Sequence, residues 1–387
     1  MDRQQKGILT LIRSAVTGQP LTLPQDFDLE AAMPLVKAHN IAPLVCQGAL
    51  SCGLPPSGAL LAGYGKSLRQ SEGQLLALNQ LTAAFEKAHI HYMPLKGTNT
   101  KALYPKPELR VMGDADILIR MEQYDQIKPI LEDLGYEFLI ESNHELIWNS
   151  PCLHLELHKR LIPSYNTDYA AYFGDGWRLA RKGPGSRYSL SAEDDFIYQF
   201  THFAKHYREG GIGCRHVTDL WVYLRHFADM DTAYLEKELE KLQLLEFYGN
   251  IRRLIEAWFA DGPEDERTFF ISDFIFRSGN WGMEKDHVVS AELRHVKAGG
   301  SIAAGRARSV MAALFPSLET LRQPYPVLKK APWLLPLIWP VRWVTTLLFR
   351  GDAIRARQKK WATASPAEIR TYQDALNYVG LDFRFEK

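Results

Sequence analysis

The chain has 387 residues, which is enough for two or three domains with a sizeable hydrophobic core. Its formal net charge of +1 gives no overall electrostatic signature for nucleic-acid binding, so any such contact would have to be local. The first residues contain no apolar signal-peptide segment, and the four cysteines form neither a Cys-x-x-Cys pair nor a zinc-binding spacing. We therefore expect a cytoplasmic protein with reduced thiols.

The first 88 residues are predicted to be helical. Apolar residues recur at spacings of three and four from Leu29 to Leu50 and from Gly58 to His89, and Pro55-Pro56 separates the two stretches. The clearest amphipathic helix runs from Ser71 to Lys87 and leads directly into the first predicted strand.

The pattern becomes mixed α/β between residues 89 and 190. Short strand patterns alternate with turns and with one helix that ends at a glycine. We predict strands at 91–95, 111–119, 136–140, 145–149, 152–158 and 187–190, and a helix at 121–134.

Two features of this region suggest a site. The first strand ends in Lys96-Gly97-Thr98, and the second strand carries Asp114 and Asp116. Side chains at i and i+2 of a strand point to the same face, so these two carboxylates lie side by side while Ile117 points into the core. Paired carboxylates on a rigid face are typical ligands of Mg²⁺, and through it of a polyphosphate.

A later strand supplies a third carboxylate. The segment from Leu153 to His158 alternates strictly, with leucines on one face and His154, Glu156 and His158 on the other. If this strand neighbours the one with the two aspartates, Glu156 completes a three-carboxylate cluster. A transition-metal site on the three polar residues is the alternative, but same-face neighbours on one strand are about 6.5–7 Å apart, which favours Mg²⁺.

The order of strand, glycine turn, helix, Asp-x-Asp strand and later acidic strand resembles the polymerase-β-type nucleotidyltransferase superfamily. The Leu-Lys-Gly turn, Leu103-Tyr104-Pro105, the segment Arg110 to Asp116, and Glu156-Leu157-His158 are closer to its bacterial "uncharacterised nucleotidyltransferase" branch. The resemblance covers residues 90–160 well. It implies an α+β fold in which a small mixed-sheet nucleotidyltransferase core (89–190) is flanked by an N-terminal helical region (1–88) and a C-terminal helical domain (191–387).

The resemblance also implies an enzyme that transfers a nucleoside monophosphate from a nucleoside triphosphate (NTP) to an acceptor hydroxyl. By match to the motif, Asp114, Asp116 and Glu156 would be catalytic and would hold two Mg²⁺ ions. The nucleotide-binding residues would include Lys96, Gly97, Thr98 and Arg110.

The turn departs from the superfamily's usual Gly-Ser or Gly-Gly, because Lys96 precedes a single Gly97. The lysine can offer its charge to a phosphate. In an ordinary strand-to-helix turn, by contrast, Gly97 would supply a positive φ. Replacing Asp116 with Asn is expected to abolish transfer and to leave stability unchanged or slightly raised, because like-charge repulsion is relieved.

The acceptor is open between a small molecule, a peptide and a protein hydroxyl, with tRNA ends as a further alternative. A basic groove with interleaved aromatic residues is lacking, which disfavours a template-using polymerase. A catalytically silent module that binds a nucleotide or a partner protein on the same fold is the rival interpretation. A metal-dependent phosphohydrolase is a third.

The remainder of the chain is predicted to be mainly helical. Ser191 is a good N-cap, and the acidic residues after it suit the first turn of a helix. We predict helices at 192–208, 216–228, 231–246, 248–261 and 301–313.

His202 and His206 lie four residues apart on one of these helices, and Arg215 follows. A zinc pair, helix-packing histidines and the far wall of the nucleotide cleft are the three interpretations. In related nucleotidyltransferases a helical domain follows the sheet and closes the nucleotide site, so we assign His206 and Arg215 to nucleotide binding.

The most apolar segment runs from Lys329 to Phe349 and is followed by a basic run that reaches Lys360. Pro336, Pro340 and Arg342 interrupt it, which argues against a membrane span. Two alternatives remain: a helix packed in the C-terminal domain, and an interfacial helix through which 329–360 contacts a membrane surface.

Overall fold

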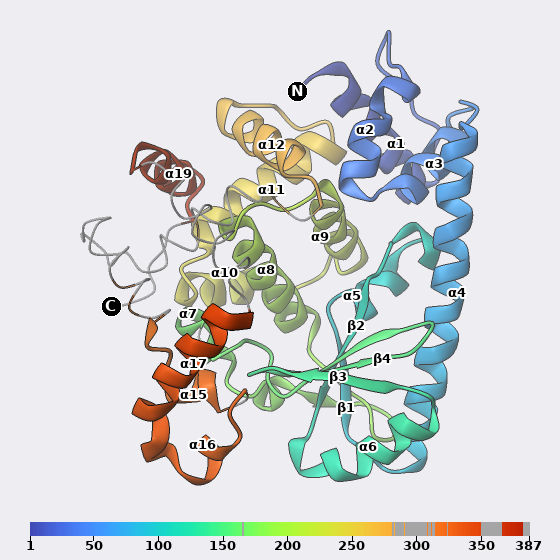
Figure 1. The fold of residues 1–387 in the computed structure, drawn as a ribbon. Helices are drawn as coiled ribbons and strands as arrows, with labels where there is room; N and C mark the ends of the chain where they lie inside the picture. Colours follow the sequence, from blue (N-terminus) through green and yellow to red (C-terminus); the bar gives the residue numbers. More distant parts are fainter. Residues whose placement is uncertain are drawn as a thin grey trace.

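A computed structural model shows a five-stranded mixed sheet between N-terminal and C-terminal helices, which confirms the predicted α+β class (Figure 1). The structure describes residues 1–164, 166–280, 314–322, 324–349 and 366–381, with single residues at 282, 290, 308 and 311.

The N-terminal helices begin at the capping residues that such sequences favour. Asp2 accepts a hydrogen bond from the backbone N–H of Gln5 at 2.8 Å, and the Gln5 side chain accepts one from the backbone N–H of Asp2. The last helix of the group extends from this cluster to the sheet (Figure 1). The helices are α1 (Arg3–Thr17), α2 (Leu29–His39), α3 (Ala42–Ser51) and α4 (Gly58–Lys87).

The main sheet has the strand order β1-β2-β5-β4-β3. Strands β2 and β5 pair in parallel, and every other neighbouring pair is antiparallel. The strands are β1 (Tyr92–Leu95), β2 (Asp114–Ile119), β3 (Glu137–Glu141), β4 (Glu145–Asn149) and β5 (His154–His158).

The period-two alternation of β2 gives the sheet two different faces. Ile117 and Ile119 pack with Phe85 of α4 and Leu131 of α6 (Tyr124–Asp133) in one hydrophobic cluster, as the sequence predicts. Leu118 points the other way, into a larger cluster that also contains residues of the N-terminal and C-terminal helices. The polar residues of β2 and β5 therefore lie on the face opposite to the one that packs on the C-terminal half of α4.

Short elements complete the central region. The predicted helix at 121–134 is divided into a 3₁₀ turn and α6, and it ends before Gly135, whose φ is 78°. The short elements are α5 (Gly97–Thr100), η1 (Lys101–Leu103), η2 (Pro107–Leu109), η3 (Met121–Gln123), α7 (Thr167–Phe173), η4 (Trp177–Leu179), β6 (Arg181–Lys182) and β7 (Tyr188–Ser189).

Helices from the C-terminal part of the chain cover the polar face of the sheet. Ser191 caps the first of them, since its hydroxyl accepts a hydrogen bond from the N–H of Asp194 at 3.1 Å. The large hydrophobic cluster joins Phe200 and Phe247 of this region to Ile8 of α1. The helices are α8 (Ala192–Arg208), α9 (Cys214–His226), α10 (Thr232–Lys241), α11 (Leu245–Phe259) and α12 (Glu266–Ser278). The predicted helix at 301–313 lies, apart from residues 308 and 311, outside the described residues.

The apolar segment after residue 329 forms a helix with two different faces. The indoles of Trp339 and Trp343 donate hydrogen bonds to the backbone carbonyls of Pro316 and Leu314, at 3.1 and 2.8 Å. No helix of the described residues is long and apolar enough to cross a membrane. The elements are α15 (Leu318–Leu321), α16 (Val327–Lys330), η5 (Pro332–Leu334), α17 (Leu335–Phe349) and α19 (Pro366–Tyr378). The predicted basic run at 350–360 lies outside the described residues.

Candidate active site

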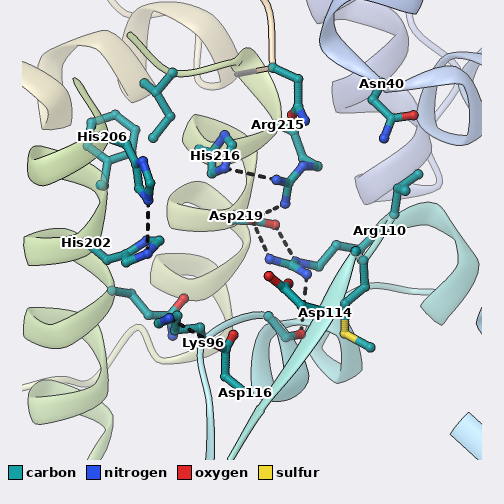
Figure 2. A pocket seen from close by; sticks show the side chains of 18 of the residues that line it. Asn40, Lys96, Arg110, Asp114, Asp116, His202, His206, Arg215, His216 and Asp219 are labelled. Carbon is teal, nitrogen blue, oxygen red and sulfur yellow. Dashed lines mark hydrogen bonds and ion pairs between the residues drawn. The ribbon is translucent and has the colours of Figure 1, made fainter. Parts of the chain in front are cut away.

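A cavity of about 620 Å³ lies between the polar face of the sheet and helices α8 and α9. Figure 2 shows side chains from both sides of it, with Asp114 and Asp116 on the strand and His202 and His206 on the facing helix. Asn40, which ends α2, lines the cavity as well. The N-terminal helices, the sheet and the C-terminal helices therefore all contribute to its wall.

The register of β2 and β5 brings the predicted carboxylates together. Asp116 lies directly beside Glu156, and Asp114 lies beside His154, in a parallel pair. Because partners in a parallel ladder share a face, Asp114, Asp116 and Glu156 all point to the cavity side of the sheet. The structure thus has the three carboxylates on one face, as the sequence pattern requires for a shared metal site.

Asp116 is already paired within the protein. Its Oδ1 accepts hydrogen bonds from Lys96 Nζ and from His158 Nε2, both at 2.8 Å. Burial alone would raise the pKa of Asp116, but the charge of Lys96 and the hydrogen bond from His158 outweigh burial and hold this pKa well below its usual range. Burial likewise opposes protonation of His158, and its carboxylate partners reverse that effect, so the pKa of His158 is raised.

Asp114 has a different electrostatic environment. Burial raises the pKa of Asp114, and the negative charges of Asp116 and Glu156 raise it further. A group of potential metal ligands in the predicted cluster consists of Asp116, Glu156 and His158, one ligand atom from each lying within 4.8 Å of the others. Asp114 is outside that group. The pairing of His158 with Asp116 was missed from the sequence, although the alternation along β5 had already placed its side chain on the polar face.

The backbone conformation of the strand-to-helix turn differs from the one expected from the sequence, which gave the positive φ to Gly97. Lys96, not Gly97, has the positive φ, with φ 45° and ψ −123°, a conformation that side chains with a Cβ rarely adopt. Gly97 is required because a Cβ there would lie 2.7 Å from the Arg110 guanidinium. The Thr98 hydroxyl accepts a hydrogen bond from the N–H of Asp116 at 3.2 Å, which ties the turn to β2.

Arg110 forms a buried ion pair with Asp219, a helix residue to which the sequence analysis assigned no role in the site. Its Nε and one terminal nitrogen donate to the two carboxylate oxygens of Asp219 on α9, at 2.9 and 3.0 Å. Tyr104 and Arg215 also donate to Asp219, at 2.7 and 3.3 Å. The other terminal nitrogen of Arg110 reaches the carbonyl of Gly97 at 3.4 Å. These contacts fix Arg110 between the turn and α9. Arg110 also lines the cavity, and its contact with a nucleotide stays a prediction.

His206 and Arg215 lie on the cavity wall formed by α8 and α9, where the cleft-wall interpretation puts them (Figure 2). The Nε2 atoms of His206 and His202 are 3.1 Å apart. Burial, and then the neighbouring imidazole, lower the pKa of His202 well below its usual value, so this ring is neutral. Among the described residues, neither histidine belongs to a group of three metal-ligating side chains.

The comparisons with known proteins gave one match. A family model described as "Uncharacterised nucleotidyltransferase" matches residues 25–260, which is more than half of the chain and includes the whole sheet, α8 and α9. The searches of curated proteins and of solved structures found no match.

Proposed function

This chain belongs to the uncharacterised nucleotidyltransferase family, and we propose that it is a metal-dependent enzyme that transfers a nucleotidyl group from an NTP to an acceptor hydroxyl. The observation that supports this function best is the pairing of Asp116 with Glu156 across β2 and β5, with Asp114 on the same face, at the wall of a cavity. A cavity of about 620 Å³ is of the size that encloses a small-molecule ligand.

The donor set fits a hard divalent cation. Asp114, Asp116 and Glu156 offer only carboxylate oxygens, which Mg²⁺ prefers. Burial raises the pKa of Asp114 and the charges of Asp116 and Glu156 raise it further, and a metal ion on this face would offset that repulsion. In the proposal these three carboxylates hold two Mg²⁺ ions. When bound, Mg²⁺ neutralises charge on the α-phosphate and on the leaving pyrophosphate.

The chain's own residues have distinct roles in this proposal. Glu156 accepts the proton of the acceptor hydroxyl, because its carboxylate lines the cavity beside Asp116. The ammonium group of Lys96 has three N–H donors. One of them donates to Asp116, and the others can donate to the triphosphate. Thr98 holds the turn against β2, while His206 and Arg215 form the opposite wall of the nucleotide site.

A second candidate function follows from the same pairing. Lys96 and His158 neutralise Asp116 from within the protein, which is an arrangement that a catalytically silent nucleotide-binding or partner-binding module could keep without a metal. The two functions differ in whether nucleotide binding requires Mg²⁺ and whether pyrophosphate is released.

Isothermal titration with each of the four NTPs, with and without Mg²⁺, separates these functions. We expect Mg²⁺-dependent binding of one NTP, followed by pyrophosphate release when mixed hydroxyl acceptors (sugars, amino alcohols and serine or tyrosine peptides) are added. Binding without pyrophosphate release supports the silent nucleotide-binding module, and no binding supports a partner-binding module. Release of inorganic phosphate instead of pyrophosphate would contradict nucleotidyl transfer and indicate a phosphohydrolase.

A further inference from the structure

We propose that His144, Glu145 and His158 form a binding site for a transition-metal ion, with Zn²⁺ as the representative ion. This site is additional to the carboxylate site proposed for Mg²⁺ and does not depend on the proposed function.

The backbone brings the three side chains to one edge of the cavity. Glu145, the first residue of β4, is the direct partner of His158, the last residue of β5, in an antiparallel pair, and His144 precedes Glu145. All three residues line the cavity.

One ligand atom from each of the three lies within 4.8 Å of the others, and His144 Nε2 is 3.0 Å from Glu145 Oε2. Tetrahedral Zn²⁺ with bonds of about 2.0–2.2 Å holds its ligand atoms about 3.3–3.6 Å apart. The side chains therefore need only small rotations to reach coordination geometry.

His158 has the environment that metal-ligating histidines usually have. Its Nε2 is hydrogen-bonded to Asp116 Oδ1 at 2.8 Å, and a carboxylate on one ring nitrogen orients the ring for a metal on the other. The side chain is 1% exposed, and its Nδ1 has no hydrogen-bond partner among the described residues. A buried ring nitrogen without a partner is costly, and a metal ion that displaces the proton from Nδ1 would supply the missing partner.

Carboxylates surround the His158 ring, which favours a cation. Glu145 is the direct strand partner of His158, and Nε2 of the ring lies 2.8 Å from Asp116 Oδ1 and 3.6 Å from Glu156 Oε2.

The ligand types distinguish this site from the carboxylate cluster. Two imidazoles and one carboxylate suit Zn²⁺ and similar transition metals, whereas Mg²⁺ prefers oxygen ligands only. Three protein ligands leave a coordination position free, as in catalytic rather than structural zinc sites. Because all three residues line the cavity, an oxygen of a bound molecule can reach that position.

The test is Zn²⁺ binding by the full chain, without nucleotide, after treatment with a chelator. Affinity is measured by competition with a chromophoric zinc chelator in the presence of excess Mg²⁺, and Co²⁺ absorbance reports nitrogen ligation. The variants are His144→Gln and Glu145→Gln, and thermal unfolding of each metal-free variant shows whether it folds. The matched control is His154→Gln, which removes a histidine of the same strand that is the direct partner of Asp114, lies 4.0 Å from Glu156 and is outside the proposed ligand set.

We expect one Zn²⁺ per chain, bound at least a hundredfold more weakly by His144→Gln and by Glu145→Gln, and within threefold of wild type by His154→Gln. Absence of Zn²⁺ binding to the wild-type chain would overturn the proposal. Wild-type affinity in a folded His144→Gln or Glu145→Gln protein would overturn it as well, because the ion would then lie elsewhere. Neither result bears on nucleotidyl transfer, since no NTP is present.

Discussion

Asp114 and Asp116 share a strand face but differ in how their charges are compensated. Asp116 is paired with Lys96 and His158, whereas the pKa of Asp114 is raised by burial and by its carboxylate neighbours. The sequence-based expectation that Asp116→Asn leaves stability unchanged is therefore reversed: this change leaves the Lys96 ammonium without its buried counter-charge.

We predict that Asp114→Asn lowers transfer at least about a hundredfold and leaves stability unchanged or raised by up to about 1 kcal/mol. Asp116→Asn should also abolish transfer, but it should lower the free energy of unfolding by about 3–5 kcal/mol. Urea unfolding and pyrophosphate release measure the two effects. Wild-type transfer by a folded Asp114→Asn protein would place the metal site elsewhere.

Gly97→Ala tests the turn. The new Cβ would lie 2.7 Å from the Arg110 guanidinium, so the ion pair with Asp219 must shift. We expect a loss of about 1–3 kcal/mol in stability together with weaker NTP binding. Gly113→Ala is the matched control, because a Cβ there meets no atom within 4 Å. If the two variants have equal NTP affinity and stability, the packing of Arg110 on Gly97 is not what fixes the turn.

Lys96→Met keeps most of the stem and deletes the charge. A charge-assisted contact to a phosphate is worth roughly 1.5–3 kcal/mol, so NTP affinity should fall about ten- to a hundredfold, and affinity for the monophosphate much less. Stability should fall too, because Asp116 loses one of its two partners. Equal losses of NTP and monophosphate affinity in titration calorimetry would show that Lys96 serves Asp116 alone.

At the scale of elements, periodicity predicted most of what lies within one segment. The strand at 145–149 and the helix at 192–208 have the predicted bounds, since alternation and a serine N-cap are local signals. The shared face of Asp114 and Asp116 is local in the same sense. That β2 and β5 are neighbours could only be assumed, because strand pairing depends on contacts between distant segments.

Helix α17 carries the prediction on membrane contact. Leu337, Val341 and Val344 are 64%, 49% and 56% exposed, and their spacing of four and three puts them on one face, away from the packed indoles. Lys329-Lys330 precede this helix in the sequence, and a basic run follows it. An exposed apolar stripe beside basic residues is typical of a helix that lies on an anionic membrane surface.

We therefore expect the chain to co-sediment with vesicles that contain phosphatidylglycerol, and less with phosphatidylcholine alone. The double change Leu337→Ser and Val341→Ser should reduce binding about tenfold, because two exposed apolar side chains no longer enter the interface. Leu76→Ser is the control, since Leu76 is 61% exposed on α4, far along the chain. Equal binding by both proteins would exclude α17 as the contact.

At the scale of the whole molecule, the buried Asp195 connects α8 to α9 and to α5 through hydrogen bonds. Asp195 accepts hydrogen bonds from Gln199 at 3.1 Å and from Tyr223 at 3.3 Å, and Gln199 in turn accepts one from Thr100 beside the turn. Burial raises the pKa of Asp195 to about 7, although both hydrogen bonds oppose this shift.

The folded state therefore binds a proton at Asp195 that the unfolded state releases near pH 4, so this residue lowers stability as pH rises from about 4 to about 7. The unfolding free energy of the wild-type protein should include a decrease of about 2–3 kcal/mol from Asp195 between pH 5 and pH 8, and Asp195→Asn should abolish this decrease. Urea unfolding at the two pH values measures it. The exposed Asp229→Asn should leave the wild-type pH dependence intact. If the stability of Asp195→Asn changes with pH as much as that of the wild-type protein, Asp195 is ionised in the folded protein.

Contacts between site residues that are far apart in the chain could not be predicted from the sequence. The nucleotide contact expected of Arg110 stays a prediction. Its ion-pair partner Asp219 lies 109 residues away, and no local pattern relates the two. His144 and Glu145 meet His158 only through the register of β4 and β5. The division of the chain at residues 88 and 190 stays a prediction.

The Arg110–Asp219 pair also restricts how this protein can diverge or be recombined. The turn that carries Gly97 is held by a guanidinium whose counter-charge belongs to α9. A chimera that takes its sheet from one relative and its helices from another would bury one charge without the other unless both parents share the pair. We therefore expect the sheet and α9 to be exchangeable between relatives only together, or where both parents have this pair.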